Sequence, residues 1–153
     1  MPVQIRVARV LLALIAVAHG AAIVALVLLQ GVLAEQISGA RPALSSSDVS
    51  KLVLLELVRT VSFHALLVVV CGIYAAKIGS GNRRVFRIVV ASQVLSVVFG
   101  IVTWFTSPDV VRFVTPAFVV TALAVLLLLL GSASARAFFS ARSHADVQAT
   151  PSR

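Results

Sequence analysis

Four long apolar runs divide the sequence, and each is long enough to cross a lipid bilayer. They cover about residues 10–33, 52–76, 88–105 and 113–135, and charged residues border them. A membrane-spanning helix needs about 20 mainly apolar residues to cross a hydrocarbon core of roughly 30 Å. Runs of this length exceed what the core of a soluble domain requires. The pattern therefore predicts an all-α integral membrane protein, a bundle of four antiparallel transmembrane helices.

The longest connecting segment, residues 34–51, is polar and is expected to form a loop. It contains Gly39 and Pro42, which disfavour a continuous helix. It ends in a serine run in which Ser45 is a good helix N-cap and Asp48 is suited to reach back toward it. We therefore expect the second helix to begin one or two turns outside the hydrocarbon.

Residues 79–82 and 106–109 are rich in turn-forming residues and predict short connections between the later spans. The first apolar run is longer than the roughly 7–15 residues of a signal-peptide core, so we expect it to remain as a span. The sequence thus predicts one transmembrane domain over residues 1–139. A polar tail over residues 140–153 is expected to be disordered and cytoplasmic.

Positive charges are unevenly divided between the two sides of the expected bundle. The sequence holds 13 Lys and Arg against 5 Asp and Glu. Nine of the basic residues precede the first run, connect the second to the third, or follow the fourth, and three lie on the opposite side. Because cytoplasmic loops are enriched in Lys and Arg, we expect a multi-pass cell-membrane protein with both termini in the cytoplasm.

The composition argues against several functional classes. Hydrophobic residues make up 60% of the chain and charged residues 12%, whereas soluble domains are about half apolar and a quarter charged. The basic residues border apolar runs instead of clustering on a polar domain, so we expect no nucleic-acid partner. No connecting segment could hold a soluble catalytic domain and no hydrolase motif is present, so we do not expect an enzyme.

Glu56 and Arg59 are ionisable residues within the second run. They are three positions apart, so their side chains are neighbours on one helix face. Pairing lowers the free energy needed to hold both in a membrane, and so does their position within about two turns of Lys51. We expect an ion pair at the membrane boundary, and the alternative is a substrate or proton site that faces a cavity.

His19 and His64 are expected at similar depths in the first and second spans. At 1.5 Å per residue, His19 lies about 15 Å past Val10 and His64 about 12 Å past Glu56, near the middle of the bilayer. Two histidines on facing helices are what an axial haem pair, a metal site or a proton relay needs. A metal site wants three or four ligands. We therefore expect two neutral core histidines without a metal or cofactor, and keep haem binding as an alternative.

The third run carries a stripe of small and polar residues along one helix face. Ser92, Ser96 and Gly100 are spaced four apart and predict a helix-packing surface, with the amide of Gln93 on its flank. We expect this stripe to pack against the polar face of the first or second span. The fourth run is apolar all round over residues 126–130, and we expect it to face lipid.

The sequence opens with Arg-Val-Ala-Arg-Val-Leu-Leu over residues 6–12, and residues 132–139 read Ser-Ala-Ser-Ala-Arg-Ala-Phe-Phe. In these features and in its plan the chain resembles small four-span integral membrane proteins of high-GC Gram-positive bacteria, mostly uncharacterised. The resemblance implies a four-helix membrane fold and no particular activity. Small multidrug transporters also have four spans, but they carry an acidic residue in the first span, where this chain has His19.

These observations favour a small inner-membrane protein without enzymatic activity, acting as an accessory or interaction subunit. Its expected partners are the lipid bilayer and, in addition, a second copy of itself or a larger membrane complex. The first alternative is a small transporter or channel subunit that uses Glu56, Arg59 and His64. The second alternative is a haem-binding redox membrane protein that uses His19 and His64.

Overall fold

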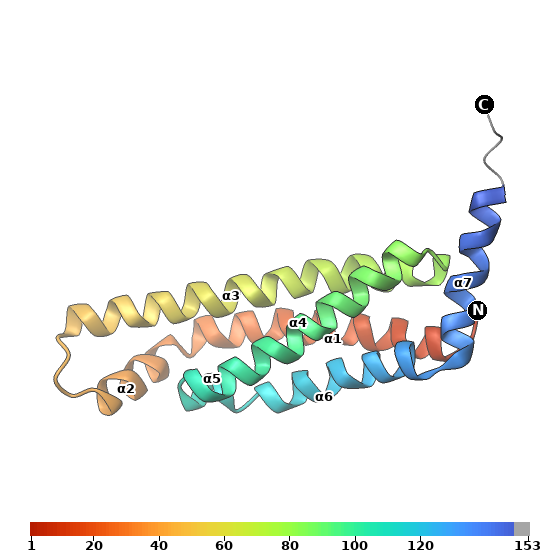
Figure 1. Cartoon of the computed structure of the whole chain (residues 1–153). Helices are drawn as coiled ribbons and strands as arrows, with labels where there is room; N and C mark the ends of the chain where they lie inside the picture. Colours follow the sequence, from red (N-terminus) through yellow and green to blue (C-terminus); the bar gives the residue numbers. More distant parts are fainter. Residues whose placement is uncertain (149–153) are drawn as a thin grey trace.

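The computed structural model describes the backbone of residues 1–148 and the side chains of residues 1–140, and this part of the chain is all helical (Figure 1). Four stretches are long and apolar enough to cross a membrane. The prediction of an all-α membrane bundle with four antiparallel spans is confirmed. The stretches are Val3–Leu28, Ser46–Ser80, Arg83–Thr106 and Asp109–Gly131.

The first span begins earlier and ends earlier than the apolar run predicts. Helix α1 covers Val3–Leu28, and a second helix, α2, covers Gln30–Ala40. The expected loop over residues 34–51 is therefore helical in its first part, because Gly39 and Pro42 come too late to prevent it. The remainder turns sharply into helix α3, Ser46–Lys77.

The start of α3 follows its predicted capping pattern. The Ser45 hydroxyl accepts a hydrogen bond from the backbone N–H of Asp48 at 3.2 Å and donates to the Asp48 carboxylate at 2.7 Å. Such contacts satisfy a backbone donor that the first helical turn would otherwise leave free. Helix α3 ends in a short 3₁₀ turn, η1 (Ile78–Ser80), and Gly81 takes a left-handed conformation before α4, Arg83–Thr106.

The fourth span consists of three helical pieces in succession. These are α5 (Asp109–Arg112), α6 (Thr115–Leu126) and a π-helical turn, η2 (Leu127–Gly131). A last helix, α7, then runs over Ala133–Gln148. Helix α7 extends into the part of the chain for which the sequence predicts a disordered tail, and no Gly or Pro interrupts this helix-compatible stretch. Residues 149–153 of the expected tail lie outside the described residues.

The helices associate as two closely packed pairs. Helix α1 lies along α3, and α4 lies along α6 (Figure 1). Helices α2 and α5 meet at one end of the bundle, and the N-terminus, η1 and α7 lie at the other. We refer to these as the α2–α5 end and the α7 end.

The apolar core occupies the half of the bundle nearest the α7 end. It is one contiguous cluster of buried side chains from α1, α3, α4, the fourth span and α7, and Leu12, Val89, Val125 and Leu129 within it have no exposed surface. Large apolar side chains such as Leu28, Phe105 and Phe113 project from the outside of the bundle. An apolar exterior is what contact with lipid requires, since lipid chains are as apolar as these side chains.

Candidate functional site

The structure brings His19 and His64 into direct contact at the middle of the bundle. The Nδ1 atoms of the two rings lie 2.5 Å apart, and both side chains are buried. Helix α1 supplies His19 and helix α3 supplies His64, so the contact joins the two helices of one pair. Phe118 of α6 stacks on the His19 ring with a centroid distance of 4.2 Å and an interplanar angle of 8°, which fixes the ring from the other pair.

A hydrogen bond between two Nδ1 atoms restricts the protonation of both rings. In a neutral imidazole one nitrogen donates and the other accepts. One Nδ1 therefore carries the shared hydrogen, and the ring that donates it has an Nε2 that can only accept. The two arrangements interconvert when the shared hydrogen moves to the other Nδ1 atom. At the same time one Nε2 releases a proton and the other Nε2 takes one up. The pair can thus present either a donor or an acceptor at the His19 Nε2 atom.

A cavity of about 90 Å³ adjoins the histidine pair, and we call it the inner cavity. Its polar lining comes from His19, His64, Thr60, Ser96, Thr103 and Thr115. The aromatic rings of Phe63, Phe99 and Phe118 and a set of aliphatic side chains complete its wall. No side chain with a formal charge lines it. The cavity is large enough to hold several water molecules or one small solute.

Three of the residues that line this cavity have a polar atom without a hydrogen-bond partner among the described residues. These atoms are Nε2 of His19, Oγ1 of Thr60 and Oγ1 of Thr103. Their side chains are at least 97% buried, because the relative exposures are 1%, 1% and 3%. An unpaired polar group in a membrane interior is unfavourable by about 1–3 kcal/mol or more. The three residues come from three helices and line the same cavity.

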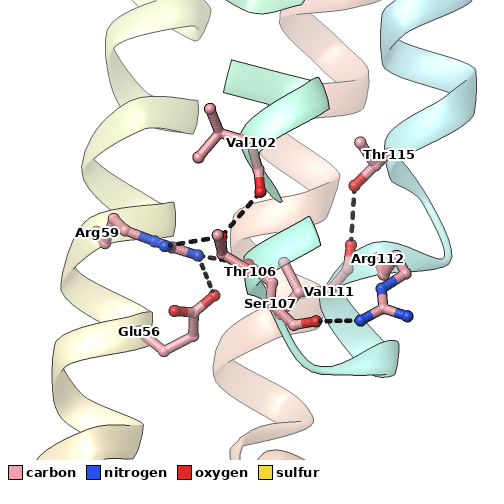
Figure 2. A network of polar contacts seen from close by, with 8 residues as sticks. All are labelled: Glu56, Arg59, Val102, Thr106, Ser107, Val111, Arg112 and Thr115. Atoms are coloured by element: carbon pink, nitrogen blue, oxygen red, sulfur yellow. Dashed lines mark hydrogen bonds and ion pairs between the residues drawn. The ribbon is translucent and has the colours of Figure 1, made fainter. Parts of the chain in front are cut away.

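Glu56 and Arg59 form the ion pair that their spacing indicates, and Arg59 also contacts α4 (Figure 2). Arg59 Nη2 donates to Glu56 Oε1 at 2.6 Å and also to the Ser107 hydroxyl, and Nη1 reaches the Thr106 hydroxyl at 3.5 Å. Charge-assisted hydrogen bonds of this kind are the strong ones. The pair therefore fastens α3 to the end of α4.

Helix α5 is held in place by polar contacts on both sides. Arg112 Nη2 donates to the Ser107 carbonyl at 3.0 Å (Figure 2), and Arg112 Nη1 lies 3.3 Å from the Asp109 carboxylate. The backbone N–H of Val110 donates to the side-chain oxygen of Gln36 at 3.1 Å, which joins α5 to α2. The short helix is therefore fixed between α2 and the end of α4.

A larger cavity of about 470 Å³ lies at the α2–α5 end, and we call it the outer cavity. Arg41, Glu56, Asp109 and Arg112 contribute charged groups to its lining. Helix α5 lies between the two cavities, because Val110 and Val111 line the inner one whereas Asp109 and Arg112 line the outer one. The sequence indicated neither cavity, since their walls come from segments far apart in the chain.

In the packing stripe of the third span Ser96 and Gly100 are buried and Ser92 is half-buried, but the partner of the stripe differs from the one predicted. A Cβ atom added at Gly100 would overlap the side chain of Val119 and touch Thr115, both on α6. The fourth span therefore takes the close approach that we expected of the first or second, and it does not simply face lipid. An apolar pattern around a helix does not reveal which face a neighbour will cover.

Gln93 reaches across to α3 from the same stripe. Its Nε2 donates to the Cys71 sulfur at 3.5 Å and lies 3.3 Å from the Ser92 hydroxyl. Ser92 in turn donates to the Val89 carbonyl within α4. Ser96, the next small residue, lines the inner cavity. Gln93 thus contributes to the contact between α4 and α3, whereas Ser96 contributes to the wall of the inner cavity.

The geometry of the histidine pair bears on the haem and metal hypotheses. A metal ion between the two Nδ1 atoms needs two bonds of about 2.0–2.1 Å, which separates the nitrogens by more than the observed 2.5 Å. Within residues 1–140 no group of three or more His, Cys, Asp or Glu side chains could hold a metal ion. The contact favours a hydrogen-bonded pair over an axial pair.

Several residues of the site are absent from the sequence hypothesis. Three residues are recognised as part of the site only from their contacts in the structure. Ser107 contacts Arg59, Arg112 contacts Ser107, and Phe118 stacks on His19. Comparison with known proteins adds no assignment, because no family model, no curated protein and no solved structure matches this chain. The function must therefore be inferred from the geometry described above.

Proposed function

We propose that this small polytopic membrane protein is a non-enzymatic transporter or channel subunit that takes up a small uncharged polar species in its inner cavity. The observation that carries the proposal is that three residues lining one cavity, His19, Thr60 and Thr103, each have a buried polar atom without a partner among the described residues. Hydrogen-bonding groups that are left open in a membrane interior are a mark of a functional site.

The cavity wall favours an uncharged species over an ion. The polar groups are imidazoles and hydroxyls, and the remaining wall is aromatic and aliphatic. A bare ion would lose its hydration without gaining an opposite charge, which is strongly unfavourable. A molecule that both donates and accepts hydrogen bonds matches the hydroxyls and the interchangeable Nε2 role of His19.

Access is proposed to come from the α2–α5 end. The short helix α5 contributes to the walls of both cavities, whereas a close-packed apolar cluster fills the bundle toward the α7 end. A movement of α5 would open the inner cavity to the outer one. The Gln36 contact to the Val110 N–H and the Arg112 contact to the Ser107 carbonyl would hold α5 closed in the state described.

We further propose that the α2–α5 end faces away from the cytoplasm. The basis is the excess of Lys and Arg at the α7 end, nine residues against three. Reporter fusions after Ser80 and after Ala43 would test this orientation. We expect a cytoplasmic signal at Ser80 and an external signal at Ala43, and the reverse result would overturn the orientation without affecting the cavity.

Permeability measurements on reconstituted vesicles test the transport proposal. Protein-containing vesicles would be exposed to gradients of urea, glycerol and water, and their volume followed by light scattering. We expect faster equilibration than in protein-free vesicles for at least one of these species. Thr60→Val and Thr103→Val should slow it several-fold, because each removes one wall hydroxyl while keeping the side-chain size.

Thr121→Val is the matched control for those variants. Thr121 lies on α6 outside both cavities, and its hydroxyl donates to the Ala117 carbonyl of its own helix. It should leave the permeability unchanged. If all vesicles equilibrate at the protein-free rate, the transport proposal fails and the accessory or interaction subunit becomes the better hypothesis.

A further inference from the structure

The outer cavity differs from the inner cavity in the charges that line it. Its two carboxylates are already engaged, since Glu56 pairs with Arg59 and Asp109 with Arg112. Arg41, at the end of α2, is exposed and makes no side-chain hydrogen bond or ion pair within the described part of the chain. Two arginines and two carboxylates line the cavity, and because Arg59 from outside the lining takes up Glu56, Arg41 is left without an anionic partner among the described residues.

Arg112, which lines this cavity, retains an unused hydrogen-bond donor, and so does Arg59 beside it. Each buries an Nε–H that has no partner among the described residues, although their Nη atoms are bonded. A guanidinium has five N–H donors and no acceptor, so what these groups lack is an acceptor. A phosphate oxygen supplies several acceptors and a negative charge, and Arg binds phosphate through paired hydrogen bonds.

One wall of the outer cavity is apolar and continues onto the lipid-facing surface. Leu52, Leu55 and Phe105 line it, and Leu55 and Phe105 are 65% and 78% exposed. A molecule that fits both walls has an anionic head and an apolar tail. The volume of about 470 Å³ is in the range of small-molecule sites and is suited to a lipid headgroup.

We propose that the outer cavity binds the phosphate group of an anionic phospholipid. Arg41 and Arg112 contact the phosphate, and the acyl chain follows Leu55 and Phe105 down the side of the bundle. The Arg59–Glu56 pair contributes indirectly, because Arg59 holds Ser107, whose carbonyl positions Arg112. The proposal is independent of transport through the inner cavity.

The protein contains its own reporter for this site. Trp104 is the single tryptophan of the chain, and the Arg112 guanidinium carbon lies 5.9 Å from the centre of its ring. A phosphate bound to Arg112 changes the electric field at the indole. Binding is therefore expected to shift or quench the Trp104 fluorescence.

The experiment places the whole protein in nanodiscs of zwitterionic phosphatidylcholine with increasing amounts of anionic phosphatidylglycerol. We expect a saturable change in Trp104 emission. Arg41→Gln should shift the midpoint to about tenfold more anionic lipid, because it removes one charge-assisted contact. Arg41 has no partner in the described residues, so this variant is expected to fold normally.

Arg9→Gln is the matched control, since Arg9 is an exposed cation of α1 near the α7 end. It should leave the midpoint unchanged. An equal shift for Arg9→Gln and Arg41→Gln would show general surface attraction and overturn the site. Emission that does not depend on phosphatidylglycerol would also overturn it.

A second arm separates the lipid from a soluble source of phosphate. Glycerol 3-phosphate is titrated into nanodiscs of phosphatidylcholine alone. A weak response, together with the response to phosphatidylglycerol, supports the lipid. A response of equal size that Arg41→Gln weakens supports the phosphate site but overturns the lipid as its natural ligand.

Discussion

The two halves of the bundle differ in packing and polarity. The half near the α7 end is a close-packed apolar core, in which Gln93 is the single buried polar residue among those described. The other buried polar residues of the described part lie between the middle of the bundle and the α2–α5 end, together with both cavities. We infer that the α7 half stabilises the bundle by close packing, whereas the part toward the α2–α5 end contains the candidate binding sites.

The membrane makes this division possible. Apolar helices gain nothing from leaving lipid for a protein interior, so close packing has to hold them together. The α7 half provides that packing through small and branched side chains such as Ala8, Val89 and Val125. The other half can then keep open space and unpaired polar atoms, as functional sites often do.

The largest effect is expected at Gly100, where α4 and α6 approach each other closely. Gly100→Leu should destabilise the protein by about 3 kcal/mol or prevent folding, since even a Cβ atom would overlap Val119. Val98→Leu is the control, because Val98 is 51% exposed on the same helix. The remaining folded fraction after heating in detergent measures both. Equal tolerance of the two changes would mean that α4 and α6 are not in close contact.

The second effect tests whether the α7 half carries the stability. Leu12 is completely buried in its apolar cluster. Leu12→Ala should lower the free energy of unfolding by about 2 kcal/mol, the low end for a core leucine, because lipid is as apolar as the lost side chain. Leu130→Ala, at a 43% exposed position nearby, should have little effect on unfolding in the same denaturant titration.

The third effect concerns the connection between α3 and α4 at the other end. Glu56→Gln and Arg59→Gln should each destabilise the protein, whereas the double variant should recover part of the loss, with a coupling of about 1–2 kcal/mol. Single variants leave one charge unpaired near hydrocarbon, and the double variant leaves none. Strictly additive losses in a double-mutant cycle would show that the pair adds nothing to stability.

The smallest effect on the free energy of unfolding is expected at Thr60, which lines the inner cavity. Thr60→Val should change the free energy of unfolding by less than about 1 kcal/mol, because its hydroxyl has no partner in the protein to lose. The same denaturant titration that is used for Leu12→Ala measures it. A loss as large as that of Leu12→Ala would mean that the Thr60 hydroxyl is part of the packing, and the two halves would no longer differ.

Residue spacing and apolar length determined much of this protein in advance. Apolar length and residue spacing predict the four spans, the Ser45 cap, the Glu56–Arg59 neighbourhood and the burial of His19 and His64. These features depend on one helix at a time, and a helix fixes the positions of its own residues within a few turns.

Only the tertiary structure decided which faces meet. The approach of Gly100 to α6, the stacking of Phe118 on His19 and the helical course of residues 30–40 depend on neighbours that the sequence pattern does not name. The two cavities depend on them as well, because each wall combines residues from several helices. In a membrane, apolar side chains suit lipid and protein equally, so hydropathy sets the spans whereas shape and hydrogen bonding select their partners.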